Sequence, residues 1–132
     1  MSADTARSAP CPCGGSSLVA CCGRYLGTQL PAPDAQTLMR SRYTAFVLDQ
    51  REHLLASWHA STRPAAIAPP EPGLRWLGLE VLAHCTTGRE TACVEFVARS
   101  KLGGRARRLH EISRFVREAG RWYYVDGEVA QR

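Results

Sequence analysis

The stretch RRLHEISRFVREAGRWYYVDGE, residues 107–128, contains two runs of strand length that are separated by Ala119 and Gly120. A connection this short joins strands that run antiparallel. Two further runs of strand length precede it, at residues 75–85 and 91–100, and each is followed by a turn that contains glycine. The second half of the chain is therefore predicted to form a four-stranded antiparallel meander.

Both faces of the third run, residues 107–117, mix polar and apolar side chains. Successive side chains of a strand point to opposite faces. One face therefore carries Leu109, Glu111, Ser113 and Phe115, and the other carries His110, Ile112, Arg114 and Val116. This mixture indicates a curved sheet whose concave face lines a partly polar cavity.

Two helices are predicted ahead of the sheet. Asp34 is a suitable N-cap because its carboxylate can accept from the free amide groups of the next turn, and apolar residues at three-to-four spacing follow in residues 35–48. Asp49 and Glu52 have the spacing of a capping box, which predicts a second helix that Pro64 ends. Helices followed by a meander indicate an α+β fold in which the helices cover one face of the sheet.

The segment CPCGGSSLVACCG, residues 11–23, holds Cys11, Cys13, Cys21 and Cys22. Two close cysteine pairs on either side of a short loop can present four sulfur atoms to one tetrahedral metal ion, with zinc as the default and iron as an alternative. The other interpretation is a set of disulfides or redox thiols. Adjacent Cys21 and Cys22 can bridge only through a strained ring, so a metal knuckle is favoured, and metal binding must supply its folding energy.

Length and composition suit one ordinary domain. With 132 residues, 45% of them hydrophobic, the chain can form one core, with the metal knuckle as a small appendix. Residues 1–10 are small and polar and are expected to form a disordered tail. Neither a signal-peptide pattern nor an apolar run of membrane-spanning length is found, which favours a cytoplasmic protein with reduced thiols. The formal charge of +5 is spread along the chain, so RNA or ribosome binding is a minority interpretation.

Several segments, taken in order, resemble the YchJ family of bacterial proteins: CPCG, CCGRYL, LMRSRYTAFV, SWHAS, RWLGLEVL, VEFVAR, HEISRF and RWYYVDG. The cysteine segment is similar to the SEC-C metal-binding motif at the C-terminus of the translocation ATPase SecA, although residues 14–20 make its loop one residue shorter than usual. The remainder resembles the nuclear transport factor 2-like (NTF2-like) cone, in which N-terminal helices pack on a curved antiparallel sheet. The resemblance implies a disordered tail at 1–10, a knuckle and connector at 11–30, and an NTF2-like domain at 31–132.

A cone of this kind often encloses a ligand or an active site, and several polar side chains are weak candidates for such a cavity: His59, Glu95, His110, Glu111 and Arg114. Each has a structural alternative. His59 suits the C-terminal end of a helix, and Glu111 with Arg114 suits an ion pair of the sheet. Arg40 and Arg42 are interpreted as solvated or ion-paired flanks of the first helix. The chain contains no glycine-rich phosphate loop, nucleophile elbow or His-Glu-x-x-His pattern, so catalysis is the less favoured interpretation.

Cys85 and Cys93 lie outside the cysteine segment. If the first hairpin turns about Arg89, the two residues face each other, because both are four residues from the turn. A cross-strand disulfide is then geometrically possible. In a reducing cytosol we expect buried thiols that behave as small apolar groups.

Three classes of function follow from these patterns. The leading one is a metal-binding module that binds a protein partner, with a role in protein handling or export as the SecA resemblance implies. The second is a ligand carrier or enzyme that uses the cone cavity. The third is RNA or ribosome binding through residues 105–108 and the metal knuckle. The sequence leaves the partner, the oligomeric state and the metal open.

Overall fold

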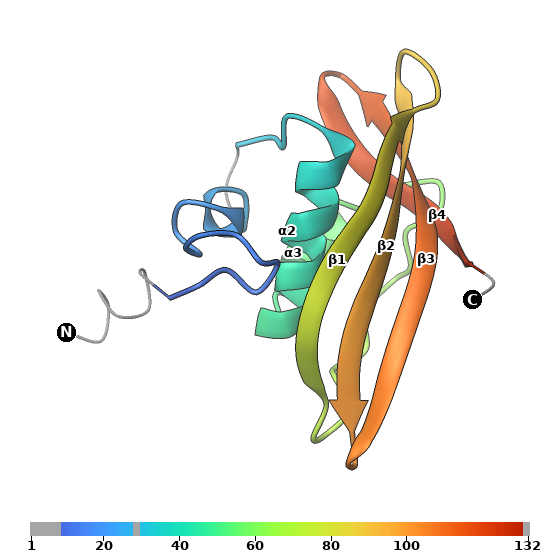
Figure 1. Cartoon of the computed structure of the whole chain (residues 1–132). Helices are drawn as coiled ribbons and strands as arrows, with labels where there is room; N and C mark the ends of the chain where they lie inside the picture. Colours follow the sequence, from blue (N-terminus) through green and yellow to red (C-terminus); the bar gives the residue numbers. More distant parts are fainter. Residues whose placement is uncertain (1–8, 28–29, 131–132) are drawn as a thin grey trace.

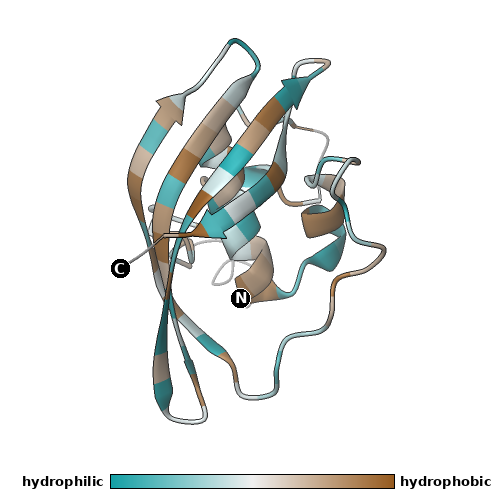
Figure 2. Cartoon of the chain, turned by 90° about the vertical axis from the view of Figure 1, so that its right-hand side faces the viewer, coloured by the Kyte–Doolittle hydropathy of each residue, from teal (hydrophilic) through white to brown (hydrophobic). Residues whose placement is uncertain are grey.

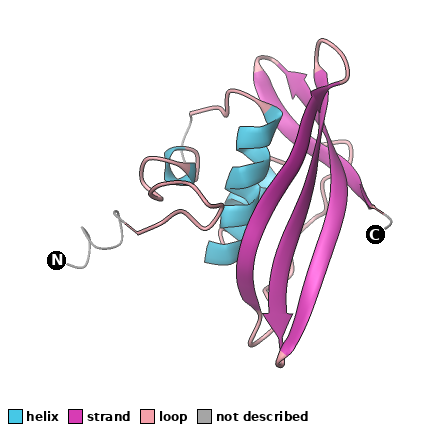
Figure 3. Cartoon of the chain, viewed as in Figure 1, coloured by secondary structure: helices cyan, strands magenta, loops and turns pink. Residues whose placement is uncertain are grey.

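The computed structural model describes residues 9–27 and 30–130. Two α-helices precede a sheet of four strands in the order β1-β2-β3-β4, and every neighbouring pair is antiparallel. The elements are η1 (Cys22–Arg24), α2 (Ala35–Leu48), α3 (Arg51–Ala56), β1 (Arg75–Thr86), β2 (Thr91–Leu102), β3 (Arg105–Glu118) and β4 (Arg121–Val129). The helices lie on one side of the sheet, which confirms the predicted α+β meander (Figures 1 and 3). Most of the tail predicted at residues 1–10 lies outside the described residues.

Asp34 begins α2 as predicted. Its side-chain Oδ1 accepts a hydrogen bond from the backbone N–H of Thr37 at 2.8 Å, which satisfies one of the free amide groups of the first turn. The capping box predicted at Asp49 is wrong. Asp49 instead ends α2 in the left-handed conformation, with φ 58° and ψ 45°, and α3 then begins at Arg51 without a side-chain cap.

The second helix is also shorter than predicted, because α3 ends at Ala56. Trp58 therefore lies beyond the helix, where it forms an isolated bridge with Tyr124 of β4. The rings of these two residues meet edge to face, with centroids 5.0 Å apart. This contact joins the end of the helical layer to the last strand.

The sheet is curved around α2. Register shifts interrupt β1 between Trp76 and Gly78 and again between Val81 and Ala83, and bulges of this kind bend a strand and increase its twist. Polar and apolar residues alternate along the strands, as Figure 2 shows. The face toward the helices supplies Val94, Phe96, Ala98 and Phe115 to the main core, which α2 completes with Leu38, Met39 and Tyr43.

The cysteine segment packs on α2 and is not an appendix. Cys11, Cys13 and Cys22 are buried in the same cluster as Leu38 and Met39. The cysteine segment lies beside α2, on the side that faces away from the sheet (Figure 1). Helix α2 is buried on more than one face, so it contacts the knuckle on one side and the sheet on the other.

The first hairpin has the register that its symmetry predicts. Cys85 and Cys93 are paired across β1 and β2, with their Cα atoms 5.4 Å apart, and the two residues form a disulfide. The expectation of buried thiols is wrong, because both residues lie next to the turn that closes the hairpin and Cys85 is exposed. Within the described ranges, no helix is long and apolar enough to cross a membrane.

Candidate metal centre and the polar groups of the sheet

The four N-terminal cysteines converge on one point. The Sγ atoms of Cys11, Cys13, Cys21 and Cys22 all lie within 4.8 Å of one another, and the Sγ atoms of Cys13 and Cys21 are 3.6 Å apart. Four thiolates at about 2.3 Å from a tetrahedral zinc ion lie about 3.8 Å from each other. Both the donor type and the spacing therefore fit a metal ion, and the cluster could hold one.

Glycines allow the two cysteine pairs to approach each other. The N–H of Gly14, which has a φ of 101°, donates to the carbonyl of Cys11 at 3.0 Å and closes the first turn. A Cβ atom on Gly15 would lie 2.5 Å from the Sγ atom of Cys21, which is closer than packed atoms allow. The carbonyl of Leu18 accepts from the N–H groups of Cys21 and Gly23 and so closes the second turn. The shortened loop thus still brings the two pairs together.

Helix α2 supports the cluster from one side. The Oγ1 atom of Thr44 lies 3.6 Å from the Sγ atom of Cys11, and both groups are buried. Arg40, one turn earlier, donates from Nη1 to the backbone carbonyl of Cys13 at 3.0 Å. Contacts of this kind fix the orientation of groups that bind a metal.

The electrostatics of the cluster favour a cation. The side-chain hydrogen bond from Cys22 lowers the pKa of Cys13 to about 4, although burial opposes this change. Burial raises the pKa of Cys21 to about 11, and the bond and charge of Cys13 add to the effect. The hydrogen bond to Cys13, followed by burial, raises the pKa of Cys22 as well. The bare cluster therefore favours negative charge on Cys13, and a divalent ion would favour ionisation of Cys21 and Cys22 as well.

A small hollow of about 170 Å³ lies beside the cluster. Its walls include Cys21, Cys22, Arg24, Tyr25 and Arg40. The guanidinium carbon of Arg24 lies 5.5 Å from the centroid of the Tyr25 ring. The side of the metal knuckle next to α2 is therefore basic and partly aromatic.

The five cavity candidates do not gather in one place. His59 lies after α3, where Nε2 contacts Oε2 of Glu118 at 2.8 Å and Nδ1 contacts the Ser61 hydroxyl at 2.7 Å. His110 and Glu95 form a cross-strand pair, with Nε2 and Oε2 2.7 Å apart, on the sheet face away from the helices. Neither contact reaches the space between the sheet and α2.

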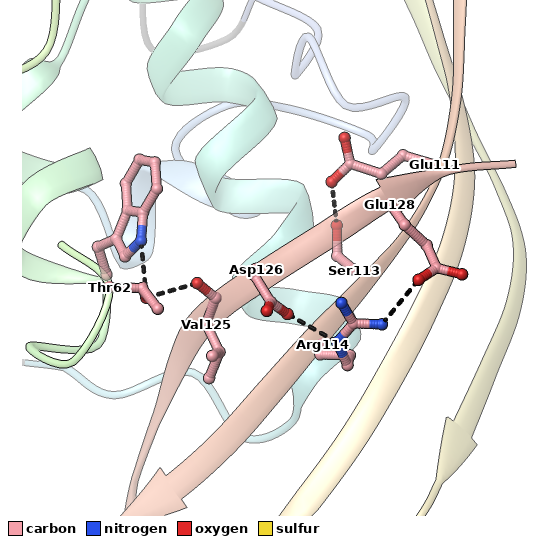
Figure 4. Close-up of polar contacts among 8 residues, drawn as sticks. Thr62, Glu111, Ser113, Arg114, Val125, Asp126 and Glu128 are labelled. Carbon is pink, nitrogen blue, oxygen red and sulfur yellow. Dashed lines mark hydrogen bonds and ion pairs between the residues drawn. The ribbon is translucent and has the colours of Figure 1, made fainter. Parts of the chain in front are cut away.

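Glu111 and Arg114 lie on opposite faces of β3. The Glu111 carboxylate accepts from the Ser113 hydroxyl at 2.7 Å, on the face toward α2 (Figure 4). Arg114 donates from Nε to Asp126 at 2.7 Å and from Nη1 to Glu128 at 3.3 Å. Of the five candidates, Glu111 is therefore the one that borders the cavity between α2 and the sheet, here called the inner cavity. Arg114 belongs to an ion-pair network of β3 and β4.

Arg42 is the inner polar residue that the sequence interpretation missed. It is 6% exposed and is not a solvated flank of α2. Its Nη1 donates to the Leu54 carbonyl at 2.8 Å and to the Ser57 hydroxyl at 2.7 Å. Burial lowers its pKa to about 10. Its position could have been found from helical spacing, because residue 42 lies four positions after buried Leu38 and so falls on the apolar face of α2.

The matches to known proteins together cover almost the whole chain. The family described as "YchJ, middle NTF2-like domain" matches residues 34–127. A UPF0225 protein of Methylibium petroleiphilum is 74% identical over 120 residues, which cover 91% of this chain and 88% of the relative. A UPF0225 protein of Chromobacterium violaceum is 58% identical over 128 residues, which cover 92% of this chain and 94% of the relative.

Two solved structures are similar as well. The solution structure of a SEC-C motif containing protein from Rhodopseudomonas palustris is 29% identical, with a TM-score of 0.82, and the match covers 92% of this chain and 99% of that one. The crystal structure of a SEC-C motif containing protein from Psychrobacter arcticus is 26% identical, with a TM-score of 0.78, and the match covers 97% and 86%. The likeness therefore extends over the cysteine segment as well as the sheet.

Proposed function

This chain belongs to the YchJ family, and we propose that it is a zinc-stabilised module that binds another protein, as an accessory in protein handling or export in the cytoplasm. The metal centre consists of Cys11, Cys13, Cys21 and Cys22, with iron as the alternative metal. The convergence of their four sulfur atoms within 4.8 Å is the observation that carries the proposal. The SEC-C motif named for both solved relatives supports it.

The metal has a structural role in this proposal. Structural zinc sites are closed by four protein ligands, whereas catalytic sites keep a position open for water or substrate. Four cysteine sulfurs complete a tetrahedral site, and three of these residues are at most 3% exposed. The ion would therefore hold the loop of residues 14–20 rigidly against α2, and its surface would be available for binding.

The charge around the site indicates what kind of partner would fit. Arg24 is exposed and stands at the rim of the hollow beside Cys21 and Cys22. Arg40 adds a second guanidinium group to the same hollow. With a formal charge of +5 on the whole chain, this surface suits an acidic segment of a protein partner.

Charge reversal near the metal site tests the proposal. We expect Arg24→Glu to retain the metal but to lose most of its capture of partner proteins from a nuclease-treated bacterial lysate, because the carboxylate would repel an acidic segment. Arg99→Glu is the matched control, since Arg99 is an exposed arginine of β2 in the opposite layer. The captured proteins are quantified by mass spectrometry. Equal capture by wild type and Arg24→Glu would contradict binding at this surface.

A further inference from the structure

A cavity of about 320 Å³ lies between α2 and the inner face of the sheet. Aromatic side chains form much of its wall: Tyr43, Phe46, Trp58, Trp76 and Phe96. This volume is at the lower end of the range for sites that bind small molecules, which begins at about 300 Å³. The cavity is separate from the metal knuckle, which lies on the other side of α2.

Arg42 projects into this cavity with unused hydrogen-bond donors. Its guanidinium carbon lies 4.4 Å from the Tyr124 ring centroid and 5.0 Å from that of Trp58. Nη1 donates both of its hydrogen bonds, to the Leu54 carbonyl and the Ser57 hydroxyl. Among residues 9–27 and 30–130, no partner is found for Nε or Nη2, and no carboxylate lies within 4 Å of the guanidinium group. A buried cation that has no ion pair is stabilised when an anion contacts it.

Glu111 limits the charge of any anion that could bind beside Arg42. Its carboxylate borders the same cavity, where it attracts Arg42 from a distance without forming an ion pair, and it accepts a hydrogen bond from Ser113 (Figure 4). Glu111 repels any anion in this cavity, and it repels a dianion such as phosphate more strongly than a monoanion, while one arginine cannot neutralise both charges of a dianion. A monoanion requires only the single guanidinium group.

The shape of the unused donors selects among monoanions. Nε and Nη2 lie on one edge of the planar guanidinium group and can donate two parallel hydrogen bonds to a carboxylate. The walls of the cavity are mostly aromatic and aliphatic, so they suit a ligand whose remaining part is apolar. We propose that the cavity binds a small carboxylic acid with an apolar body, whose carboxylate takes the Nε and Nη2 edge of Arg42 while the body packs against Trp76 and Phe96.

The NMR signals of the tryptophan indole N–H groups give a direct test of ligand binding to the intact protein. The chain contains three tryptophans, of which Trp58 and Trp76 line the cavity and Trp122 does not. Phenylacetate and octanoate are the probes, and phenylacetamide and octanamide are their uncharged counterparts. We expect at least one of the acids, at millimolar concentration, to shift the indole N–H signals of Trp58 and Trp76 in the ¹⁵N–¹H spectrum and to leave that of Trp122 in place. The matched amide should bind about tenfold more weakly, because it loses a charge-assisted hydrogen bond.

Two variants and a control separate recognition of the carboxylate from effects on folding. Arg42→Lys keeps the charge but removes the two-donor edge, so the preference for acid over amide should fall several-fold. Ala98→Leu fills the cavity from β2 and leaves Arg42 intact, so it should abolish the shifts. Arg99→Gln on the outer side of the same strand should bind like wild type. Equal binding of acid and amide, or no movement of the Trp58 and Trp76 signals with any probe, would overturn the proposal, whatever the metal site does.

Discussion

His53 is a half-buried titratable residue of the helical layer. The Ser41 hydroxyl donates to the Leu38 carbonyl at 2.8 Å, so its oxygen accepts from Nε2 of His53 at 2.9 Å. Burial, and then the positive charge of Arg42, lowers the pKa of His53 to about 4. The imidazole is therefore neutral in the folded protein throughout the neutral range.

This histidine should make the protein less stable in mild acid. The unfolded chain takes up the proton near pH 6.5 and the folded chain only near pH 4, so stability falls as pH decreases between these values and rises again with pH. Urea unfolding from pH 7.5 to pH 4 measures the effect as the difference between wild type and His53→Gln. The exposed His84, changed to Gln, is the control. Parallel pH profiles of wild type and His53→Gln would contradict a neutral imidazole at residue 53 in the folded protein.

Arg42 shows why single residues were hard to place from the sequence. Arg40 and Arg42 have the same chemistry and lie two positions apart, so they point in different directions from α2. One contacts the carbonyl of Cys13 and the other enters the inner cavity. Helical spacing assigns residue 42 to the apolar face, but the sequence does not show that Tyr124 and Trp58 meet there from distant segments.

At the level of secondary structure, the cap of α2 can be tested most simply. Asp34→Ala removes the acceptor of the Thr37 N–H and should destabilise the protein by about 1 kcal/mol. Asp34→Asn keeps a side-chain oxygen at this position and should lose much less. Chemical denaturation of the three proteins gives the comparison. If both variants were as stable as wild type, the cap would contribute nothing to the fold.

The elements that sequence analysis predicted correctly depend on local patterns. The Asp34 cap, the four strands and the register of Cys85 opposite Cys93 each follow from spacing within a short segment. Asp49 was assigned to a capping box because its spacing to Glu52 fits, yet it adopts a left-handed conformation that ends α2. Aspartate tolerates both conformations, so its spacing alone does not decide between starting and ending a helix.

In the whole molecule, α2 separates two possible binding sites. The cysteine cluster packs on one side of this helix, and the inner cavity lies on the other side, toward the sheet. The clustering of the four cysteines was predictable from their spacing. Their burial in the main core was not, because it depends on contacts with α2 such as that of Cys11 with Thr44, 33 residues away.

Because the cysteines share the core of α2, loss of a metal ion should affect the stability of the whole domain. The cluster buries Cys11, Cys13 and Cys22 together with Leu38 and Met39. Removing the ion would leave thiols with opposed pKa values in this core, as the lowered value of Cys13 and the raised value of Cys21 indicate. A single cooperative unfolding transition at lower temperature is therefore expected after chelation.

The metal content of protein purified without a histidine tag and without added metal tests the central claim most directly. It is measured together with the reactive thiols and the melting temperature, before and after chelation. The account predicts about one zinc or iron ion per chain, four additional thiols released by the chelator, and a lower melting temperature in one transition. Protein that contains no metal, and whose four N-terminal cysteines react or oxidise without a chelator, would contradict it.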